Sequence, residues 1–433
     1  MAKTVILGGG MTGLAAGMAS GLPVYEAASY PGGICASYYM RPHTSERMHE
    51  QPADGEAYHF EVGGGHWIFG GDPAVIEFIG SRVKLQTYNR RSSVYLPADK
   101  LYVPYPLQNH LRVLGPARAA AALRQMSRQP GPFMTMKEWM QRYFGELLCT
   151  LFFYPFHELY TAGLYDRIAP QDAYKSPIDI GRAIDGAFAD VSPVGYNAQF
   201  VYPGDGLNVL ATRMAERCDI RYGNRVARIE PHSRIVSFAD GSDLPYERLI
   251  STLPLNQVME MCALTVDCPP DPHSSVLVVN FGGTRGPQCP NDHWLYFPAS
   301  ASGFHRVGFY NAVDPRFLPA SSRAGEDRVS LYVERAFPGG ARPSVSETSA
   351  YTGSVVRELK ELGYIGEAEV VDPTWIDVAY TWSWPGSRWR EQALRKLEEH
   401  RIFQVGRYGR WVFQGIADSI RDGFILGCSF RDN

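Results

Sequence analysis

The chain has 433 residues, of which 45% are hydrophobic and 20% are charged, and its formal net charge is −3. This length exceeds one ordinary domain and predicts two or three domains, each with its own core. A slightly negative net charge gives no electrostatic basis for binding nucleic acid or an anionic membrane. Aromatic residues make up 12% of the chain, a share that suits a site that stacks on planar rings.

The seven cysteines are scattered along the chain without any C-x-x-C pair. An odd, unpatterned set predicts reduced thiols in a cytoplasm, with neither a disulfide framework nor a zinc site. The first strand is expected to start at Thr4, which leaves no room for a signal peptide, and no apolar run is long enough to span a bilayer. We therefore expect a cytoplasmic protein without a membrane span, and the sequence leaves a homo-oligomer open.

The N-terminal segment carries the clearest motif of the chain. An apolar run over residues 4–7 predicts a buried parallel strand, and Gly8, Gly10 and Gly13 follow it with the spacing G-x-G-x-x-G. The first glycine permits a tight turn, the second lets the backbone approach a pyrophosphate, and the third lets a helix pack on the strand. The helix that begins near Met11 directs its unpaired N–H groups at that pyrophosphate.

An acidic residue follows this glycine motif at the position expected for a ribose contact. Glu26 ends the second expected strand, where its carboxylate can accept hydrogen bonds from a ribose. The separation of Gly8 and Glu26 is slightly below the usual spacing of about 20 residues, so we expect a first helix shortened by roughly one turn. Gly32 and Gly33 follow shortly afterwards, and this extra turn favours FAD over NAD. The alternative is a tight strand–helix turn that binds no ligand.

A second glycine cluster, Gly63-Gly64-Gly65, directly precedes His66. Consecutive glycines let the backbone press close to another group, which beside a flavin domain is expected to be the isoalloxazine ring. A satisfied buried histidine is the alternative for His66. Residues 38–60 are polar and irregular, and we expect them to form a surface excursion.

The middle of the chain is expected to be helical. Prolines 104 and 106 exclude a helix interior over residues 101–111. From about residue 112 to residue 163 the apolar spacing becomes helical, which predicts a helical insertion.

The second half of the chain is expected to be rich in strands. Short strands are predicted over residues 221–253, with a hairpin turn at Asp240-Gly241, and an antiparallel sheet is predicted over residues 272–335. Helices are expected at 345–363 and 389–400, before a last strand, a glycine turn and a final helix. The predicted fold class is therefore α/β: a Rossmann-like FAD-binding domain (residues 1–85, 195–255 and 400–433), a mainly helical domain (86–194) and an antiparallel β-sheet substrate domain (256–399).

Four sets of segments point to a family. They are Gly64-Gly-His66-Trp-Ile-Phe, Val103-Pro-Tyr-Pro-Leu-Gln108-Asn, Trp294-Leu-Tyr-Phe-Pro298 with Phe304-His-Arg306, and Gly406-Arg407-Tyr-Gly409. Together they resemble the UDP-galactopyranose mutase family, most closely its eukaryotic-type branch, in family order and at roughly family spacing. The G-x-G-x-x-G motif belongs to many flavoproteins, whereas the tyrosine–proline–glutamine and arginine segments are much more specific.

The resemblance implies a flavoenzyme that acts as an intramolecular transferase (isomerase) and interconverts the pyranose and furanose forms of a nucleotide-sugar. In this redox-neutral reaction, N5 of the reduced flavin attacks the anomeric carbon and expels the nucleoside diphosphate. The flavin–sugar adduct opens, recloses through a different hydroxyl, and the diphosphate returns. NADPH or NADH is the expected reductant, and furanose biosynthesis is the expected role.

The resemblance also assigns roles to single residues. His66 is expected beside the flavin, and Arg306 and Arg407 are expected to clamp the diphosphate, because a planar guanidinium makes paired hydrogen bonds to phosphate. For each arginine alone, a solvated surface charge is the alternative. The other expected substrate contacts are Tyr105, Gln108, Asn197, Tyr296, Trp384 and Phe413. The expected cofactor contacts are Gly8, Gly10, Met11, Thr12, Gly13, Glu26, Gly32, Gly33, Gly64, Gly65, Val226, Gly406, Gly415, Ile416 and Ser419.

The chain departs from the family pattern at several of these positions. Trp384 and Phe413 stand where the family has tyrosines that reach the phosphates, so two hydroxyl donors worth roughly 1 kcal/mol or more each are expected to be missing. Gly415 replaces an acidic flavin contact, and Lys175 is the nearest candidate for a family arginine near the flavin and sugar. These departures point to a different sugar, nucleotide or phosphate position.

Two other functions remain open. The first is an FAD-dependent oxidase or desaturase of the amine-oxidase and protoporphyrinogen-oxidase superfamily, which shares the FAD architecture. The segment from Tyr105 to Gln108 and both arginines argue against it, because an apolar or amine substrate has no use for a diphosphate clamp. The second is a protein that binds FAD or a nucleotide but catalyses no reaction.

Overall fold

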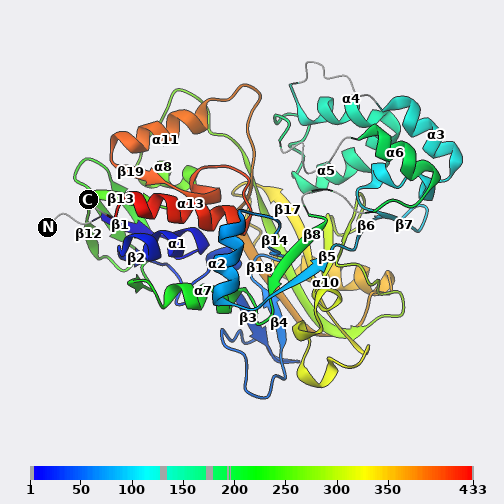
Figure 1. Cartoon of the computed structure of the whole chain (residues 1–433), viewed down its shortest axis with the longest axis horizontal. Coiled ribbons are helices and arrows are strands. Elements are labelled where there is room, and N and C mark those ends of the chain that lie inside the picture. Colours follow the sequence, from blue (N-terminus) through cyan, green and yellow to red (C-terminus); the bar gives the residue numbers. More distant parts are fainter. Residues whose placement is uncertain (1–3, 127–133, 172–178, 193–194, 196, 432–433) are drawn as a thin grey trace.

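The computed structural model describes residues 4–126, 134–171, 179–192, 195 and 197–431. A parallel sheet with its helices forms one end of the molecule, a largely antiparallel sheet forms the centre, and a group of helices forms the other end (Figure 1). The expected α/β fold class is therefore confirmed. Lys175 lies outside the described residues.

The parallel sheet has five strands in the order β19-β13-β1-β2-β9. Its central strand β1 is buried along its whole length because helices cover both faces, as in a Rossmann-like domain. Ile6 faces α1 (Met11–Ser20) and α13 (Ile416–Ser429), whereas Val5 and Leu7 face α8 (Leu255–Met261) and α11 (Trp389–Glu399). The strands are β1 (Thr4–Leu7), β2 (Val24–Tyr25), β9 (Ile220–Arg221), β13 (Arg248–Ser251) and β19 (Ile402–Gln404).

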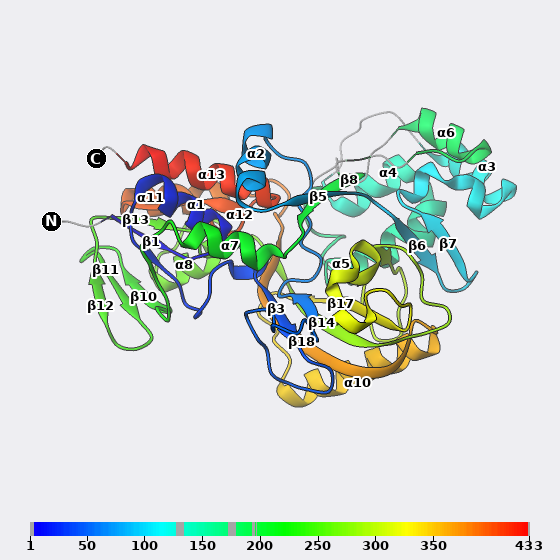
Figure 2. The same ribbon diagram turned by 60° about the horizontal axis from the view of Figure 1, so that its bottom comes forward.

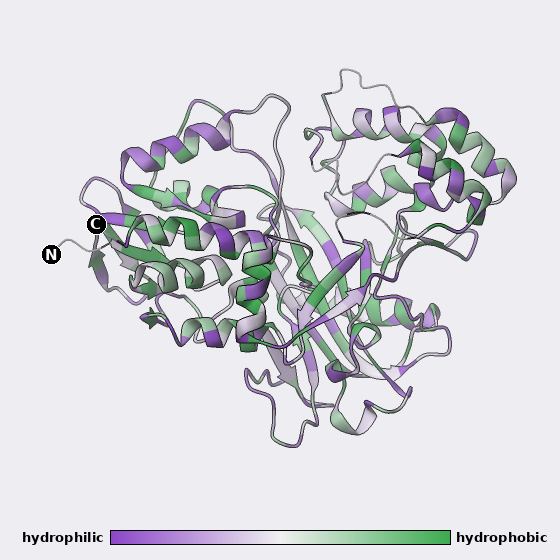
Figure 3. Ribbon diagram, in the orientation of Figure 1, coloured by the Kyte–Doolittle hydropathy of each residue, from purple (hydrophilic) through white to green (hydrophobic). Residues whose placement is uncertain are grey.

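Small residues bring α1 and α13 into close contact. A Cβ atom at Gly423 would lie 2.3 Å from the Thr12 carbonyl oxygen, and one at Gly427 would lie 2.6 Å from the Ala16 carbonyl oxygen. Glycines four residues apart share one helix face, so α13 can approach the α1 backbone directly. Helices α1 and α11 differ in hydropathy in Figure 3: α1 is mainly pale to green, which marks apolar residues, whereas the more exposed α11 is largely purple, which marks polar ones.

The central sheet has seven strands in the order β18-β14-β17-β16-β15-β6-β7. All neighbouring strands are antiparallel except β15 and β6, which are parallel. Helix α10 (Val345–Glu361) covers one face of the sheet, on the side away from the helical group (Figure 2). The strands are β6 (Ser92–Leu96), β7 (Leu101–Pro104), β14 (His273–Arg285), β15 (Trp294–Tyr296), β16 (Arg306–Phe309), β17 (Arg328–Pro338) and β18 (Ile365–Thr381).

The helical group contains the helices that the spacing predicted between residues 112 and 163. Its elements are α3 (Pro116–Gln125), α4 (Met136–Leu148), a π-helical turn (Cys149–Phe153), α5 (Tyr154–Tyr160) and α6 (Ile180–Phe188). Large apolar residues, among them Trp139, Phe144 and Phe152, form a separate core there. The remaining elements are α2 (Pro73–Arg82), β5 (Leu85–Asn89), β8 (Gln199–Pro203), α7 (Leu207–Ala215), β10 (Val226–Glu230), β11 (Ile235–Phe238), β12 (Asp243–Pro245), α9 (Tyr310–Val313) and α12 (Gly406–Gly409).

The structure corrects the expectation for residues 38–60. Two buried antiparallel strands, β3 (Ser37–Met40) and β4 (Tyr58–Glu61), stand at the ends of this segment, and only the residues between them form an excursion. The long polar run between the strands concealed them. Strand β18 had no predicted counterpart, because acidic residues and Pro373 interrupt its pattern; as an edge strand it tolerates this proline.

The sheets also divide the chain differently from the expected domain boundaries. Strands β6 and β7, from the expected helical range 86–194, belong to the seven-stranded sheet. Helix α11, from the expected substrate range 256–399, packs on the parallel sheet. The three-part division remains our proposal, with these elements reassigned.

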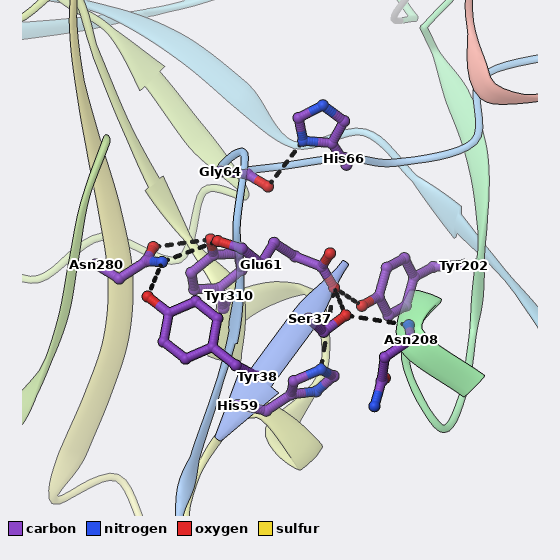
Figure 4. Close-up of polar contacts among 10 residues, drawn as sticks. All are labelled: Ser37, Tyr38, His59, Glu61, Gly64, His66, Tyr202, Asn208, Asn280 and Tyr310. Carbon is purple, nitrogen blue, oxygen red and sulfur yellow. Dashed lines mark hydrogen bonds and ion pairs between the residues drawn. The ribbon is translucent and has the colours of Figure 1, made fainter. Parts of the chain in front are cut away.

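A buried polar network joins β3 and β4 to the seven-stranded sheet (Figure 4). The Asn280 side-chain amide donates hydrogen bonds to the Glu61 carbonyl oxygen and to the Tyr38 hydroxyl, each at 2.8 Å. The Tyr310 hydroxyl donates to the Asn280 side-chain oxygen at 3.0 Å. These bonds fix the backbone at Glu61, just before the glycines that lead to His66.

The Glu61 carboxyl group is itself buried in this network. It accepts hydrogen bonds from the hydroxyls of Ser37, at 3.0 Å, and Tyr202, and His59 Nε2 lies 4.0 Å away. Within the described residues, Glu61 Oε2 has no hydrogen-bond partner. Burial raises the pKa of Glu61 to about 8 and lowers the pKa of His59 to about 3, so His59 is neutral and provides no compensating charge.

Replacing Gly423 by alanine should destabilise the fold by about 1–3 kcal/mol, because the added methyl group would overlap the Thr12 carbonyl. Chemical denaturation measures this loss of unfolding free energy. Gly353→Ala is the matched control, since a Cβ atom in that helix would meet only Arg357 Nη1 at 3.7 Å. It should stabilise the protein by about 0.5–1 kcal/mol. Equal effects of the two substitutions would contradict the close α1–α13 contact.

Glu61→Gln should change how stability depends on pH. Because the folded-state pKa of Glu61 is raised, the folded protein binds this proton more tightly than the unfolded chain, so the wild-type unfolding free energy declines as pH rises from about 4.5 to about 8. The glutamine variant lacks this decline. Thermal melts should therefore show its Tm rising relative to wild type between pH 5 and pH 8, whereas the exposed control Glu46→Gln should show a constant difference. A constant difference for Glu61→Gln would refute the assignment.

Candidate active site

The glycine turn after β1 has the geometry of a dinucleotide site. Gly8 has φ +99°, and a Cβ atom there would lie 2.2 Å from Thr252 Oγ1. A Cβ atom at Gly13 would lie 1.8 Å from the Gly8 carbonyl oxygen, so the helix could not pack on the strand. A Cβ atom at Gly10 would meet only the Gly32 carbonyl oxygen, at 3.9 Å. Packing therefore requires the first and third glycines, and the second leaves space for a ligand.

The N-terminus of α1 adjoins this space. No side chain caps the helix, and its first turn contains no acidic residue, so the terminus suits an anion. Glu26 accepts the Gly9 N–H at 2.6 Å through Oε2 and the Ala28 N–H at 2.7 Å through Oε1. The carboxylate thus holds the glycine turn, and its remaining lone pairs can accept ribose hydroxyls.

Two further glycine turns close around the same helix terminus. Gly32 and Gly33 have φ angles of +108° and +56°, and the Gly32 N–H donates to the Gly9 carbonyl at 2.9 Å. A Cβ atom at Gly406 would lie 2.5 Å from Thr12 Oγ1. Of the other expected cofactor residues, Met11 is buried in the core, Val226 begins β10, and Ser419 lies in the first turn of α13. The residues around α1 therefore fit an FAD.

A cavity of about 490 Å³ lies where the three parts of the molecule meet. Residues from the His66 loop, the seven-stranded sheet, α5 and the segment before α13 line it. It brings together many of the residues that the sequence singled out: Gly65, His66, Tyr105, Asn197, Tyr296, Arg306, Arg407, Phe413, Gly415 and Ile416.

Strand register explains how the sheet builds its side of the cavity. Tyr296 on β15 lies opposite Arg306 on β16, Arg306 lies opposite Glu334 on β17, and Glu334 lies opposite Val278 on β14. Residues directly opposite in neighbouring strands project from the same face of a sheet. This row therefore faces the cavity, while α10 covers the other face.

Arg306 is bound to a buried acid. Its Nη2 lies 2.5 Å from both carboxylate oxygens of Glu334, which is only 2% exposed. Burial alone would raise the pKa of Glu334, but the charge of Arg306 outweighs it, with a contribution from His305, and lowers the pKa to about 2. His305 Nε2 lies 3.5 Å from Glu334 Oε2. Arg306 is thus a cavity residue with its own counter-ion, and the alternative of a solvated surface charge does not apply.

Arg407 is held without an acid. Its guanidinium donates to the carbonyl oxygens of Gln414 at 3.1 Å and Ala379 at 3.3 Å. It lies 4.5 Å from the centre of the Phe413 ring and 5.6 Å from that of Tyr408. Among the described residues, no carboxylate lies within ion-pair distance of Arg407. Its positive charge is therefore available to an anion in the cavity.

His66 lines the cavity between these charges and the glycine loop. Its Nδ1 lies 3.3 Å from the Gly64 carbonyl oxygen, as Figure 4 shows. Burial, together with the positive charge of Arg407, lowers the pKa of His66 to about 4. The imidazole is therefore neutral at pH 7. A Cβ atom at Gly64 would meet Glu334 Oε1 at 2.8 Å, so this loop is pressed against β17.

Aromatic residues form one wall of the cavity. The π-helical turn and α5 contribute Phe152, Phe153, Phe156 and Tyr160 to the cavity lining. Tyr105 also lines the cavity, as expected, and its ring centre lies 4.7 Å from that of Tyr296. This wall can stack on planar rings and exclude water.

Other expected substrate residues lie elsewhere. The Trp384 indole N–H donates to the Pro270 carbonyl at 3.0 Å, and Trp384 does not line the cavity. Gln108, in the η2 turn (Leu107–Asn109), is 1% exposed and does not line the cavity. Tyr380 on β18 lines the cavity. It brings a tyrosine hydroxyl there, although the loss of one had been expected because Trp384 stands at a family tyrosine position. Its hydroxyl lies 3.5 Å from Glu334 Oε2.

Glu334 and Tyr380 are the main residues that sequence reasoning missed. The available signal for Glu334 was a charged residue inside an apolar strand, facing the same side as Tyr332. Tyr380 lies in β18, for which no element had been predicted. Strand pairing brings these two residues close to Arg306, and the sequence of either segment alone does not reveal that pairing.

In the part of the chain that the structure describes, no group of three or more His, Cys, Asp or Glu side chains could hold a metal ion. Within the same residues, every helix is too short or too polar to cross a lipid bilayer.

No protein-family model matches the chain. A reduced UDP-galactopyranose mutase has a TM-score of 0.81 at 21% identity, over 99% of this chain and 95% of that chain. A protein from Exiguobacterium sp. 255-15 assigned as a protoporphyrinogen oxidase has a TM-score of 0.68 at 14% identity, over 99% of this chain and 98% of that chain. A putrescine oxidase bound to putrescine has a TM-score of 0.56 at 16% identity, over the same shares. The chain therefore has the fold of UDP-galactopyranose mutase, and the resemblance read from the sequence is confirmed at the level of the fold.

Proposed function

We propose that this protein is a flavin-dependent mutase that interconverts the pyranose and furanose forms of a nucleotide-sugar. The observation that carries the proposal is that Arg306 and Arg407, far apart in the sequence, line one cavity together with His66. A guanidinium pair beside a glycine-rich loop suits the diphosphate of a nucleotide-sugar. The shared fold with a UDP-galactopyranose mutase supports the same reaction class.

FAD is the proposed cofactor, since the glycine turns around α1 fit a dinucleotide and Gly65, His66, Gly415 and Ile416 bring a loop and a helix terminus to the cavity. When bound in its reduced form, a flavin supplies a nucleophile for the anomeric carbon, which no side chain of the cavity needs to provide. NADPH or NADH is the proposed reductant. The proposed location is the cytoplasm, and a homo-oligomer is left open.

The chain's own residues have distinct tasks in this proposal. Arg407 binds the diphosphate and stabilises its charge as the bond to the sugar breaks, because no carboxylate of the described residues competes for its guanidinium. Tyr105 and Tyr296 offer aromatic rings for the base, and the phenylalanine wall keeps water from the reacting sugar. Neutral His66 offers a hydrogen-bonding group beside the cofactor without adding charge.

The cavity retains tyrosine hydroxyls despite Phe413 and Trp384. Tyr160, Tyr296 and Tyr380 all line it, so hydroxyl donors for the diphosphate come from the sheet and α5. The choice of sugar and base stays open, and UDP-galactose is the first substrate to test.

A flavin oxidase is the second candidate, because a protoporphyrinogen oxidase and a putrescine oxidase share the fold and the cavity wall is strongly aromatic. The unbalanced charge of Arg407 speaks against it, since a cationic amine would be repelled there. Steady oxygen consumption with an amine, without isomerisation of any nucleotide-sugar, would favour the oxidase. A yellow protein inactive in both assays would indicate binding without catalysis.

Dithionite-reduced, FAD-loaded protein should convert UDP-galactopyranose to its furanose form without net consumption of reductant, as chromatography of the products would show.

Arg407→Ala should weaken UDP binding by about 10- to 100-fold, because hydrogen bonds to charged groups contribute about 1.5–3 kcal/mol each. The flavin absorbance should persist. Arg395→Ala is the control, since Arg395 lies on the exposed side of α11, paired with Glu391. Full UDP, GDP and dTDP affinity in Arg407→Ala would refute the diphosphate role.

A further inference from the structure

The two cavity arginines differ in how their charge is balanced. Arg407 is held by two carbonyl oxygens and two aromatic rings, which leave its positive charge intact. Arg306 is held by both oxygens of the Glu334 carboxylate at 2.5 Å. An anion that enters the cavity therefore meets one free charge at Arg407 and one neutralised charge at Arg306.

The Glu334 carboxylate opposes an anion at Arg306 in two ways. It occupies the Nη2 donors of Arg306, and its negative charge repels a phosphate placed beside the same guanidinium. Glu334 is only 2% exposed, so water cannot replace Arg306 as its partner. A carboxylate left without its counter-ion in such a place is strongly unfavourable. Phosphate binding at Arg306 thus requires another positive charge near Glu334.

Several titratable or charged side chains lie near Glu334 or line the same cavity. Burial raises the pKa values of Tyr332 on β17 and Tyr380 on β18, so these phenols stay neutral. Apart from His305, the other titratable or charged residues that line the cavity are His66, Tyr105, His157, Tyr160, Tyr296, Arg306, Arg407, Tyr408 and Asp418. None of the tyrosines can become positive.

His305 can become positive. Its Nε2 lies 3.5 Å from Glu334 Oε2, and the residue is 1% exposed. The rings of Tyr160 and Phe156 lie 5.4 Å and 6.1 Å from the imidazole centre. Burial lowers the pKa of His305 and outweighs the neighbouring Glu334, which raises it, while Arg306 adds to the lowering. The imidazole is therefore neutral at pH 7 while Arg306 balances Glu334. Removing Arg306 from this pair would favour the imidazolium, since the neighbouring carboxylate would then be uncompensated.

We propose that Glu334 competes with the ligand's phosphate for Arg306, and that His305 takes up a proton from solvent when phosphate displaces the carboxylate. The proposal rests on the proposed function, because it assumes that a diphosphate ligand reaches Arg306. Arg306 keeps its proton and changes partner. The imidazole of His305 gains a proton from solvent and forms an ion pair with Glu334. No electrons move.

Proton uptake makes ligand binding depend on pH. When binding consumes a proton, affinity falls as pH rises, by up to about tenfold per pH unit for one proton. Glu334 is then the residue that sets affinity, and His305 is a positioning residue that acts through it.

Calorimetry tests the proposal without relying on turnover. UDP-galactose is titrated into FAD-loaded protein at pH 7.5 in PIPES, HEPES and Tris, whose ionisation enthalpies differ. This ligand is suitable because its diphosphate, esterified at both ends, has no pKa near neutrality. The dependence of binding enthalpy on the buffer should give an uptake of about half to one proton per ligand.

Glu334→Gln should abolish the uptake, remove the pH dependence of Kd, and tighten binding at pH 8 by about fivefold or more, because the amide does not compete for Arg306. His305→Gln should also abolish the uptake but weaken binding, since the carboxylate then lacks a new partner. Glu369→Gln is the matched control. It breaks the Arg328–Glu369 pair on the same sheet, whose side chains have exposures of 24% and 6%, against 24% and 2% for Arg306 and Glu334. This control should leave the uptake unchanged.

The outcomes separate this inference from the proposed function. Binding of UDP-galactose without proton uptake would overturn the inference and leave the nucleotide-sugar ligand intact. Uptake that persists in both Glu334→Gln and His305→Gln would also overturn it and would point to another histidine of the cavity, His66 or His157. Absence of binding by UDP-galactose, UDP, GDP and dTDP alike would overturn the proposed function itself, and the inference with it. If Glu334→Gln does not fold, His305→Gln alone decides between these results.

Discussion

The pairing of β16 with β17 is the constraint on which the candidate site depends. It sets Arg306 directly opposite Glu334 and, through β15 and β14, extends a row of side chains across one face of the sheet. A slip of one residue would turn this row towards α10 and leave an ion pair inside an apolar core. The register thus positions the cavity charges more firmly than any loop could, because every strand of the sheet would have to move with them.

A second constraint acts at the other side of the cavity. The α1 helix is fixed between the parallel sheet and α13 by contacts that tolerate no side chain at Gly13 or Gly423. The segment that carries Arg407 and Phe413 leads directly into α13, so the position of Arg407 follows from the packing of α13 on α1. Each arginine is therefore positioned by a different part of the molecule, and the cavity exists only where these parts meet.

Local patterns predicted the parts of the protein whose structure depends on local chemistry. The glycine spacing predicted the turn at Gly8 because only a strand–helix turn requires small residues in that order. The family segments led to Arg306 and Arg407, and the structure shows both in the cavity lining. Residues 38–60 were misread because two short buried strands flank a longer polar run, and the average character of the segment followed the run.

What could not be predicted depends on contacts between distant segments. Glu334 looks like an ordinary charged residue until strand pairing sets it against Arg306. Trp384 was expected among the substrate contacts because it stands at a family tyrosine position, but the strand that ends at Thr381 brings Tyr380 to the cavity instead. Gln108 matched the family motif, yet it is buried in its turn and does not line the cavity. In each case the motif was visible and the direction of the side chain was not.

The phenyl ring of Phe413 beneath Arg407 has a consequence for the thermodynamics of recognition. An aromatic face restrains the guanidinium by cation–π attraction without using any of its N–H donors, whereas a carboxylate partner would engage them. The arginine is thereby ordered before any ligand arrives and keeps donors to offer. The conformational entropy of this long side chain is lost when the protein folds, so little of it remains to be lost at the moment of association.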